Sequence, residues 1–241
     1  VRCADTPGFL GNRVGVFALQ VGIDEAINCG LSIEDADALM GRPMGIPKTG
    51  VFGLYDLIGI DLMADVVKSL GSILPSDDAF HAVGKESSVI TLMIKNGYTG
   101  NKGNGGFYKT NPDGVLHTLQ LVGHTGENLP SYAAAKQELP ELAVRAAVAS
   151  VKQKEPLVQI LEGNTDHAKF CRRVLGRVLS YAASLIPAVT ESPQDIDDAM
   201  KLGFNWQRGP FELMDAIGHS KMGELLEEAG LKVPDILQLD Q

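Results

Sequence analysis

The residue of this sequence best suited to chemistry is Asn12, because its side chain carries an amide. An amide N–H can donate a hydrogen bond to a substrate oxygen that becomes more negative during a reaction, and such donors stabilise transition states. A second interpretation is structural: Asn12 lies on a helix face and its amide binds a neighbouring loop. The residues alone leave both interpretations open.

Other patterns that could support chemistry are weak. The five histidines are scattered: His81, His117, His124, His167 and His219. No HExxH motif, His/Cys cluster or GxSxG motif occurs, so neither a metal site nor a serine nucleophile is predicted. The glycine-rich segment 97–106 follows an apolar run, as a phosphate-binding loop would, but a short polar-aromatic segment and a Pro turn follow it instead of a helix. We therefore predict no cofactor-binding residues in this chain.

The composition limits the kind of partner. The chain has 241 residues and a net charge of −9, which argues against a nucleic-acid or anionic membrane surface. Its three cysteines (Cys3, Cys29 and Cys171) are far apart and odd in number, a pattern typical of a reducing compartment, so we expect a cytoplasmic protein. No signal peptide or membrane span is predicted. Because the chain begins at Val1, close to a helix cap, we expect a fragment of a longer protein.

The element that must position Asn12 is a long helix. Thr6 is a suitable N-cap and Pro7 suits the first helical position, so Asn12 falls in the second turn of a helix that continues to about residue 29. Small residues recur on one face of this helix: Gly8, Gly11, Gly15, Ala18 and Gly22. Because each interior glycine costs about 1 kcal/mol relative to alanine, another group must approach this backbone closely. That group is either a second helix, or a ligand or partner domain.

The rest of the chain is predicted to be mostly helical, without the strand–helix alternation of a parallel sheet. Ser32 is expected to cap a short second helix, and a Gly/Pro-rich loop is expected over 41–50. Further helices are expected at 51–57, 62–70, 77–83, 87–95, 139–152 and 166–186, and at segments that begin at residues 192, 210 and 220. A hairpin is predicted around 111–114 and a loop over 121–130. The predicted fold class is therefore all-α with a small hairpin.

Two parts of the chain are similar to each other. The segment GVFGLYDLIG at 50–59 aligns with GPFELMDAIG at 209–218, at an offset of 209 − 50 = 159 residues. Upstream, residues 32, 35, 37 and 40 are identical to residues 192, 195, 197 and 200, at an offset of 192 − 32 = 160 residues. We interpret this as a duplication, which predicts two units packed about a pseudo-two-fold axis. The predicted boundaries are 1–112 for the first repeat, 113–165 for a connector and 166–241 for the second repeat.

These motifs resemble a known family. The segment DTPGFLGNR at 5–13, the Gly/Pro loop and the following G-x-F-x-L-x-D are similar to the C-terminal domain of L-3-hydroxyacyl-CoA dehydrogenases, and residues 197–213 repeat the signature. Two copies in tandem resemble multifunctional fatty-acid β-oxidation enzymes. The resemblance implies two helical units like the C-terminal domain of 6-phosphogluconate dehydrogenase, with the hairpin and a helical connector between them.

The resemblance also implies a function. The parent enzyme would oxidise (3S)-3-hydroxyacyl-CoA to 3-oxoacyl-CoA with NAD. An upstream Rossmann domain would bind the NAD and supply a serine and a His–Glu pair. Asn12 matches the asparagine of the family and would hydrogen bond to the acyl thioester or the reacting oxygen. Pro47, Val51, Phe52 and Leu54 match the part that meets the acyl chain. The second copy has Arg172 where the first has Asn12, which we interpret as structural.

The implied partners are the acyl-CoA substrate, the Rossmann domain and an enoyl-CoA hydratase module, in an arrangement that resembles parents with the hydratase after the repeats. The resemblance is also compatible with a homodimer. Without the Rossmann domain we expect no dehydrogenase activity and negligible NAD affinity. The alternative is a non-catalytic helical interaction module, in which the repeats serve dimerisation or docking. A strand–turn–helix unit with a G-x-G-x-x-G motif upstream of this sequence would support the dehydrogenase over the interaction module.

Overall fold

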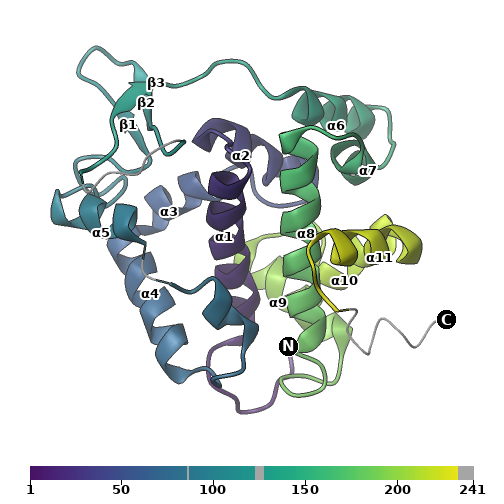
Figure 1. Ribbon diagram of the computed structural model, residues 1–241. Coiled ribbons are helices and arrows are strands. Elements are labelled where there is room, and N and C mark those ends of the chain that lie inside the picture. The colour runs from purple at the N-terminus through teal and green to yellow at the C-terminus, as the bar shows by residue number, and fades with distance from the viewer. Residues whose placement is uncertain (86, 123–127, 233–241) are drawn as a thin grey trace.

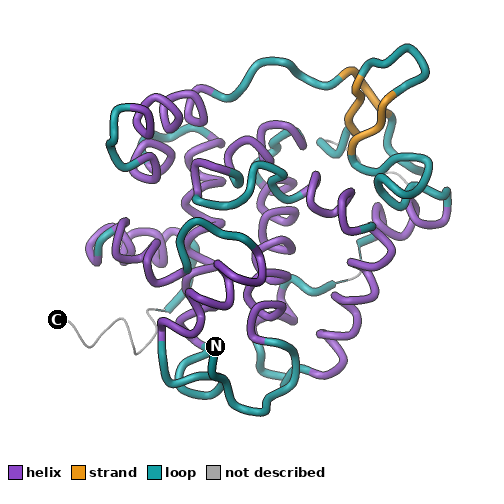
Figure 2. The backbone as a smooth tube through the Cα atoms, turned by 180° about the vertical axis from the view of Figure 1, so that it is seen from behind, coloured by secondary structure: helices purple, strands orange, loops and turns teal. Residues whose placement is uncertain are grey.

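The structure is a computed structural model that describes the whole chain except residues 86, 123–127 and 233–241. The middle of the predicted loop 121–130, with His124, and the end of the predicted unit 166–241 therefore lie outside the described residues. Helices dominate, as the sequence predicts (Figure 1). Seen from behind, the small three-stranded sheet lies at one corner of the molecule (Figure 2), where it contacts α2 and α3.

The elements follow one another in two groups. Before the sheet lie α1 (Leu10–Asn28), α2 (Ile33–Leu39), the 3-10 helix η1 (Arg42–Met44), α3 (Phe52–Ile58), α4 (Ile60–Ile73), the 3-10 helix η2 (Ala79–Ala82) and α5 (Ser88–Lys95). The sheet consists of β1 (Tyr108–Thr110), β2 (Leu116–Leu119) and β3 (Tyr132–Ala134). After it come α6 (Glu141–Val151), α7 (Pro156–Leu161), α8 (Asp166–Ser184), α9 (Pro193–Phe204), α10 (Pro210–Ile217) and α11 (His219–Glu228).

Two long helices, α1 and α8, pack against each other at the centre of the molecule (Figure 1). On the α1 side lie α3, α4 and α5, and on the α8 side lie α6, α7, α10 and α11 (Figure 1). Each central helix also contacts a helix from the other half of the chain. The helix α1 packs on α9, which follows α8, and α8 packs on α2, which follows α1. This exchange of partners is the arrangement that a pseudo-two-fold axis would produce.

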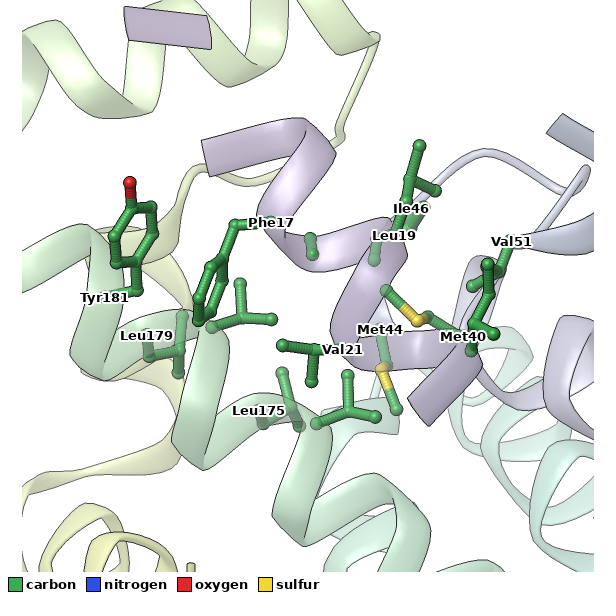
Figure 3. Close-up of a cluster of buried hydrophobic side chains, with 14 of the residues drawn as sticks. Phe17, Leu19, Val21, Met40, Met44, Ile46, Val51, Leu175, Leu179 and Tyr181 are labelled. Atoms are coloured by element: carbon green, nitrogen blue, oxygen red, sulfur yellow. The ribbon is translucent and has the colours of Figure 1, made fainter. Parts of the chain in front are cut away.

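The core follows the α1–α8 contact. Phe17 of α1 stacks on Tyr181 of α8, with ring centroids 4.0 Å apart and an angle of 17° between the ring planes. Figure 3 shows α1 side chains between those of α8 on one side and those of the α2–α3 region on the other. The labelled members of this cluster are Phe17, Leu19, Val21, Met40, Met44, Ile46, Val51, Leu175, Leu179 and Tyr181. Each fully buried side chain of this size contributes about 1.5–3 kcal/mol to folding.

The start of α1 differs from the prediction. The helix begins at Leu10 rather than near Pro7, because Gly8 has a φ of +77°, a left-handed conformation that cannot continue a right-handed helix. Phe9, with an extended backbone, occupies the N-cap position, and its side chain makes no capping hydrogen bond. Thr6 is therefore not the cap, and Asn12 lies in the first turn of the helix instead of the second.

Most other elements were predicted correctly. Ser32 caps α2, since its Oγ accepts a hydrogen bond from the N–H of Asp35 at 3.3 Å. The predicted hairpin exists as the antiparallel pair β1–β2, in which Lys109 faces His117. Strand β3, which pairs antiparallel with β2, was not predicted, and neither was α7. The loop 41–50 contains the short helix η1.

The aligned segments of the two repeats use the same local contact. At the N-terminus of α3, the carboxylate of Asp37 accepts hydrogen bonds from the N–H groups of Val51 and Phe52 at 2.7 and 2.8 Å. At the N-terminus of α10, Asp197 accepts hydrogen bonds from the N–H groups of Phe211 and Glu212 at 2.8 and 3.2 Å. In each case the carboxylate of an aspartate in one helix accepts hydrogen bonds from N–H groups at the N-terminus of a later helix. These N–H groups have no hydrogen-bond acceptor within their own helix. The two segments thus share geometry as well as sequence, while the duplication and its boundaries stay a prediction.

Candidate functional site

Asn12 opens onto a groove at the start of α1. The groove has a volume of about 620 Å³ and lies between the N-terminal segment and α4. Its lining residues are Cys3, Ala4, Asp5, Thr6, Gly8, Phe9, Leu10, Asn12, Val66, Ser69, Leu70, Ile73 and Val189. A space of this size is within the range of small-molecule sites in proteins. The walls are mostly apolar, with the amide of Asn12 and two hydroxyls among the few polar groups.

The Asn12 amide is free within the described structure. Its side chain is half-buried, and it makes no hydrogen bond to any described residue. The neighbouring loop that the structural interpretation requires is therefore not found among the described residues. A half-buried amide with unused donors can bind an oxygen of a ligand that enters the groove.

Two other residues of the groove have unusual environments. The Phe9 side chain is 81% exposed, which is high for a large apolar residue beside a helix start. Ile73, across the groove on α4, is 46% exposed. Both side chains line the groove that Asn12 lines, and exposed apolar side chains of this size are typical of a surface that a ligand or another domain covers.

The residue after Asn12 fixes the first turn of α1 in place. Arg13 points into the protein, where its guanidinium forms an ion pair with Asp78 and both side chains are 6% exposed. Its Nε also donates to the hydroxyl of Tyr181 at 3.4 Å. Burial raises the pKa of Tyr181 to about 12, so this hydroxyl keeps its proton at neutral pH. Arg13 thus ties the helix start to α8 and η2, and Asn12 is carried on a rigid turn.

The ion pair between Arg13 and Asp78 is not predicted by the sequence. Asp78 also caps η2, because its Oδ1 accepts a hydrogen bond from the N–H of Phe80 at 2.9 Å. An aspartate at a helix start, such as Asp78, indicates an N-cap in the sequence, but it does not indicate an arginine partner. Its partner, 65 residues away in sequence, could only be found from the fold.

The residues matched to the acyl chain lie elsewhere. Val51 and Phe52 are 0% exposed and belong to the core. Gly22 lies so close to Val51 that a Cβ on it would be 2.6 Å from Val51 Cγ2. Gly22 is ten residues along α1 from Asn12, which corresponds to about 15 Å of helix.

The structure therefore does not bring these residues together with Asn12. Pro47 and Leu54 are partly buried, and neither lines the Asn12 groove. Their assignment to the acyl chain stays a prediction, and in this structure Val51 and Phe52 offer no surface to a ligand.

The glycine-rich segment 97–106 does not form a dinucleotide-binding loop of the kind that holds NAD. The glycine-rich segment 97–106 leads into β1 rather than a helix, and its end packs on Asp56. The carboxylate of Asp56 accepts hydrogen bonds from the N–H groups of Phe107 and Tyr108 at 2.8 and 2.7 Å. Those N–H groups are thereby occupied within the protein. The sheet in the described part of the chain is antiparallel, so it lacks the parallel βαβ unit that holds a pyrophosphate.

Comparisons with known proteins agree with the helical fold. The family model described as 3-hydroxyacyl-CoA dehydrogenase, C-terminal domain, matches residues 8–110 and 170–236. The crystal structure of 3-hydroxybutyryl-CoA dehydrogenase from Escherichia coli has a TM-score of 0.56, is 21% identical, and is matched over 100% of this chain and 61% of its own. The chain therefore belongs to the family of 3-hydroxyacyl-CoA dehydrogenase C-terminal domains.

Two curated relatives extend this assignment. The "Putative fatty acid oxidation complex trifunctional enzyme" of Rickettsia prowazekii is 34% identical over 214 residues, covering 89% of this chain and 28% of the relative. The "Probable 3-hydroxyacyl-CoA dehydrogenase" of Bacillus subtilis is 29% identical over 234 residues, which cover 97% of this chain and 28% of the relative. The chain thus spans a little over a quarter of the length of these relatives. Within the described residues, no helix combines the length and apolar character needed to cross a membrane.

Proposed function

We propose that this chain is the helical substrate and dimerisation part of an enzyme that oxidises (3S)-3-hydroxyacyl-CoA to 3-oxoacyl-CoA in fatty-acid β-oxidation. The observation that carries the proposal is the unpartnered amide of Asn12, which opens on a groove next to a rigid helix start. Membership of the dehydrogenase family and the fatty-acid oxidation names of relatives support the same reaction class.

In this proposal Asn12 acts as a hydrogen-bond donor. Its Nδ2–H binds the thioester carbonyl or the reacting oxygen of the substrate, and the bond strengthens as that oxygen gains negative charge. The ion pair of Arg13 with Asp78 holds the helix turn, so the amide keeps its position without reorganisation. The exposed apolar side chains of Phe9 and Ile73, which line the same groove, help to exclude water from this bond once the groove is covered.

NAD and the groups that exchange protons with the substrate belong to another domain of the parent. Because the glycine-rich segment 97–106 leads into an antiparallel sheet rather than a helix, we assign the binding of NAD, with the Ser and the His–Glu pair, to a Rossmann domain that covers the Asn12 groove. The trifunctional names of relatives favour an additional module, such as an enoyl-CoA hydratase. A homodimer and a cytoplasmic location complete the proposal, and the three cysteines, free in the structure, agree with a reducing compartment.

The competing proposal is a non-catalytic helical interaction module. The exposed Phe9 favours it, since a large apolar side chain beside a groove also suits a protein partner. The sequence upstream of residue 1 distinguishes the two: a dinucleotide-binding unit supports the dehydrogenase, whereas its absence supports the interaction module.

The test is the turnover of the full-length parent enzyme carrying Asn12→Ala or Asn12→Asp. Removal of one donor to a developing oxyanion costs about 10²–10³ in turnover, and we expect at least a tenfold loss. Asn12→Asp keeps the shape but replaces the NH2 donor with an acceptor, so it should be no better than alanine. Asn164→Ala, at an exposed position before α8, is the matched control.

Thermal unfolding of each variant separates chemistry from folding. Asn12 makes no hydrogen bond to the described protein, so both substitutions should leave the unfolding temperature unchanged. Wild-type turnover in a correctly folded Asn12→Ala enzyme would remove the basis of the proposal.

A further inference from the structure

A second cavity lies where three distant parts of the chain meet, and it shares no lining residue with the Asn12 groove. Its volume is about 320 Å³, and its walls come from η1, the turn between α6 and α7, and the loop before α10. Its charged lining residues are Arg42, Lys154, Glu155 and Arg208. Three cations at one cavity are notable in a chain whose net charge is −9.

The charges of this cavity do not cancel. Arg208 Nη1 lies 2.7 Å from Glu155 Oε2, so these two residues neutralise each other. Arg42 and Lys154 form no side-chain hydrogen bond or ion pair with any described residue. The cavity therefore presents two unpaired cations, one on η1 and one on the α6–α7 turn.

The walls are held in place without a ligand. The N–H of Gln207 donates to the carbonyl oxygen of Gly45 at 2.7 Å, which joins the loop before α10 to η1. On the third wall, the N–H of Lys154 donates to the carbonyl oxygen of Ala149 at 2.9 Å. Gln153, which also lines the cavity, has a φ of +55°. This left-handed conformation, which is uncommon for a residue other than glycine, shapes the turn that leads to Lys154.

We infer that this cavity binds the phosphate group of a small phosphate-bearing ligand. An arginine can hold two phosphate oxygens with its planar fork, and a lysine adds a point charge from another direction. The amides of Gln153 and Gln207 supply neutral donors. The volume is at the lower end of small-molecule sites, which suits a phosphate or diphosphate group with part of its carrier.

The site would connect three parts of the chain. A phosphate held by Arg42 and Lys154 bridges the first repeat and the connector, and the Arg208 wall belongs to the second repeat. A ligand that binds only the folded arrangement stabilises it by mass action. The phosphate could come from coenzyme A or from a free phosphate compound, and the chemistry of recognition is the same for both. This inference does not depend on the dehydrogenase proposal.

The test is calorimetric titration of the chain with inorganic phosphate, adenosine 3′,5′-bisphosphate and coenzyme A. We expect saturable binding of one phosphate group per chain, with a dissociation constant at least about tenfold higher in Arg42→Ala/Lys154→Ala, because two charged hydrogen bonds are lost. Lys152→Ala/Lys169→Ala removes the same net charge from exposed positions outside the cavity and should bind within about twofold of wild type.

The three probes identify the source of the phosphate. Tighter binding of the bisphosphate and coenzyme A than of inorganic phosphate supports a coenzyme A phosphate, and equal binding supports a free phosphate compound. Absence of saturable binding in the wild type, or an equal loss in the Lys152/Lys169 control, overturns the inference. Single Arg42→Gln and Lys154→Gln variants, whose folding is checked by circular dichroism, keep the test valid if the double variant does not fold.

Discussion

The ring of Phe204 lies directly over Gly15, so that a Cβ atom on Gly15 would come within 2.3 Å of Phe204 Cζ. Gly15 is in the middle of α1 and Phe204 is the last residue of α9, and the two helices pack here. Further along α1, a Cβ on Gly22 would be 2.6 Å from the sulfur of Met40. The small residues of α1 therefore serve helix packing, which was one of the two alternatives left open by the sequence.

This contact predicts the cost of a larger side chain at position 15. Gly15→Leu should destabilise the chain by about 1–3 kcal/mol, because the added atoms overlap the Phe204 ring in a packed interior. The measurement is urea unfolding. Gly203→Ala, also in a helix but with open space around its Cβ position, is the control and should raise stability by about 0.5–1 kcal/mol. Unfolding of Gly15→Leu at the wild-type urea concentration would contradict the packing interpretation.

The two aspartates that cap the following helices should differ in importance. Asp37 accepts hydrogen bonds from three backbone N–H groups and from the hydroxyl of Tyr108, the latter at 2.8 Å. Asp197 accepts two backbone hydrogen bonds. Each bond to a charged group contributes about 1.5–3 kcal/mol before the cost of burial is subtracted, so the larger set should stabilise more.

We therefore expect Asp37→Ala to lower the free energy of unfolding by about 3 kcal/mol and Asp197→Ala by about 1–2 kcal/mol. Both are measured by chemical denaturation. Asp65→Ala, on the exposed face of α4, should change stability by less than about 0.5 kcal/mol. Equal losses at positions 37 and 197 would show that the additional hydrogen bonds of Asp37 do not contribute.

Local signals in the sequence predicted local structure well. The Ser32 cap and the β1–β2 hairpin were predicted because neighbouring residues determine them. The sequence wrongly predicts that Gly8 belongs to the first helix. Its spacing matches the other small residues of α1, and no feature of the sequence indicates that its φ is +77°. Strand β3 was missed because it depends on pairing with β2 rather than on its own pattern.

Contacts between distant residues could not be predicted. The buried amide of Gln20 donates to the hydroxyl of Tyr55, a hydrogen bond that forms only once α1 and α3 are packed. The sequence identified Asn12 as a candidate, but its groove depends on the packing of the N-terminal segment against α4. The burial of Val51 and Phe52 in the core likewise depends on tertiary packing, and their assignment to the acyl chain stays a prediction.

The interface between α1 and α8 also contains a buried charge. Glu25 is 0% exposed and accepts hydrogen bonds from Arg173 at 2.5 and 3.0 Å and from Arg177 at 2.5 Å. Glu25→Ala should destabilise the chain by about 3–5 kcal/mol, because it removes the buried partner of Arg173 and leaves Arg177 with Asp24 alone. Arg173→Met removes one of these partners and should have a smaller effect, since Arg177 still faces Glu25. A double-mutant cycle between positions 25 and 173 measures the coupling, and a coupling energy near zero would contradict this assignment.

Three buried carboxyl groups should make the stability of this chain depend on pH in an unusual direction. Burial raises the pKa of Asp37 to about 7 and the pKa values of Asp56 and Asp197 to about 6, although backbone N–H donors oppose the shift. In the unfolded chain an aspartate has a pKa of about 3.9. Between these values the folded state binds more protons than the unfolded state, so stability falls as the pH rises.

We therefore expect the free energy of unfolding to increase by about 3–4 kcal/mol when the pH is lowered from 7.5 to 5.5 at constant ionic strength. Urea denaturation at several pH values measures it. Asp37→Asn removes the group with the highest of these pKa values, and its stability should depend less steeply on pH than that of the wild type, whatever its absolute stability. Stability that rises steadily from pH 5.5 to 7.5 in the wild type would contradict the prediction, because it would mean that these carboxylates are more stable charged than neutral in the folded protein.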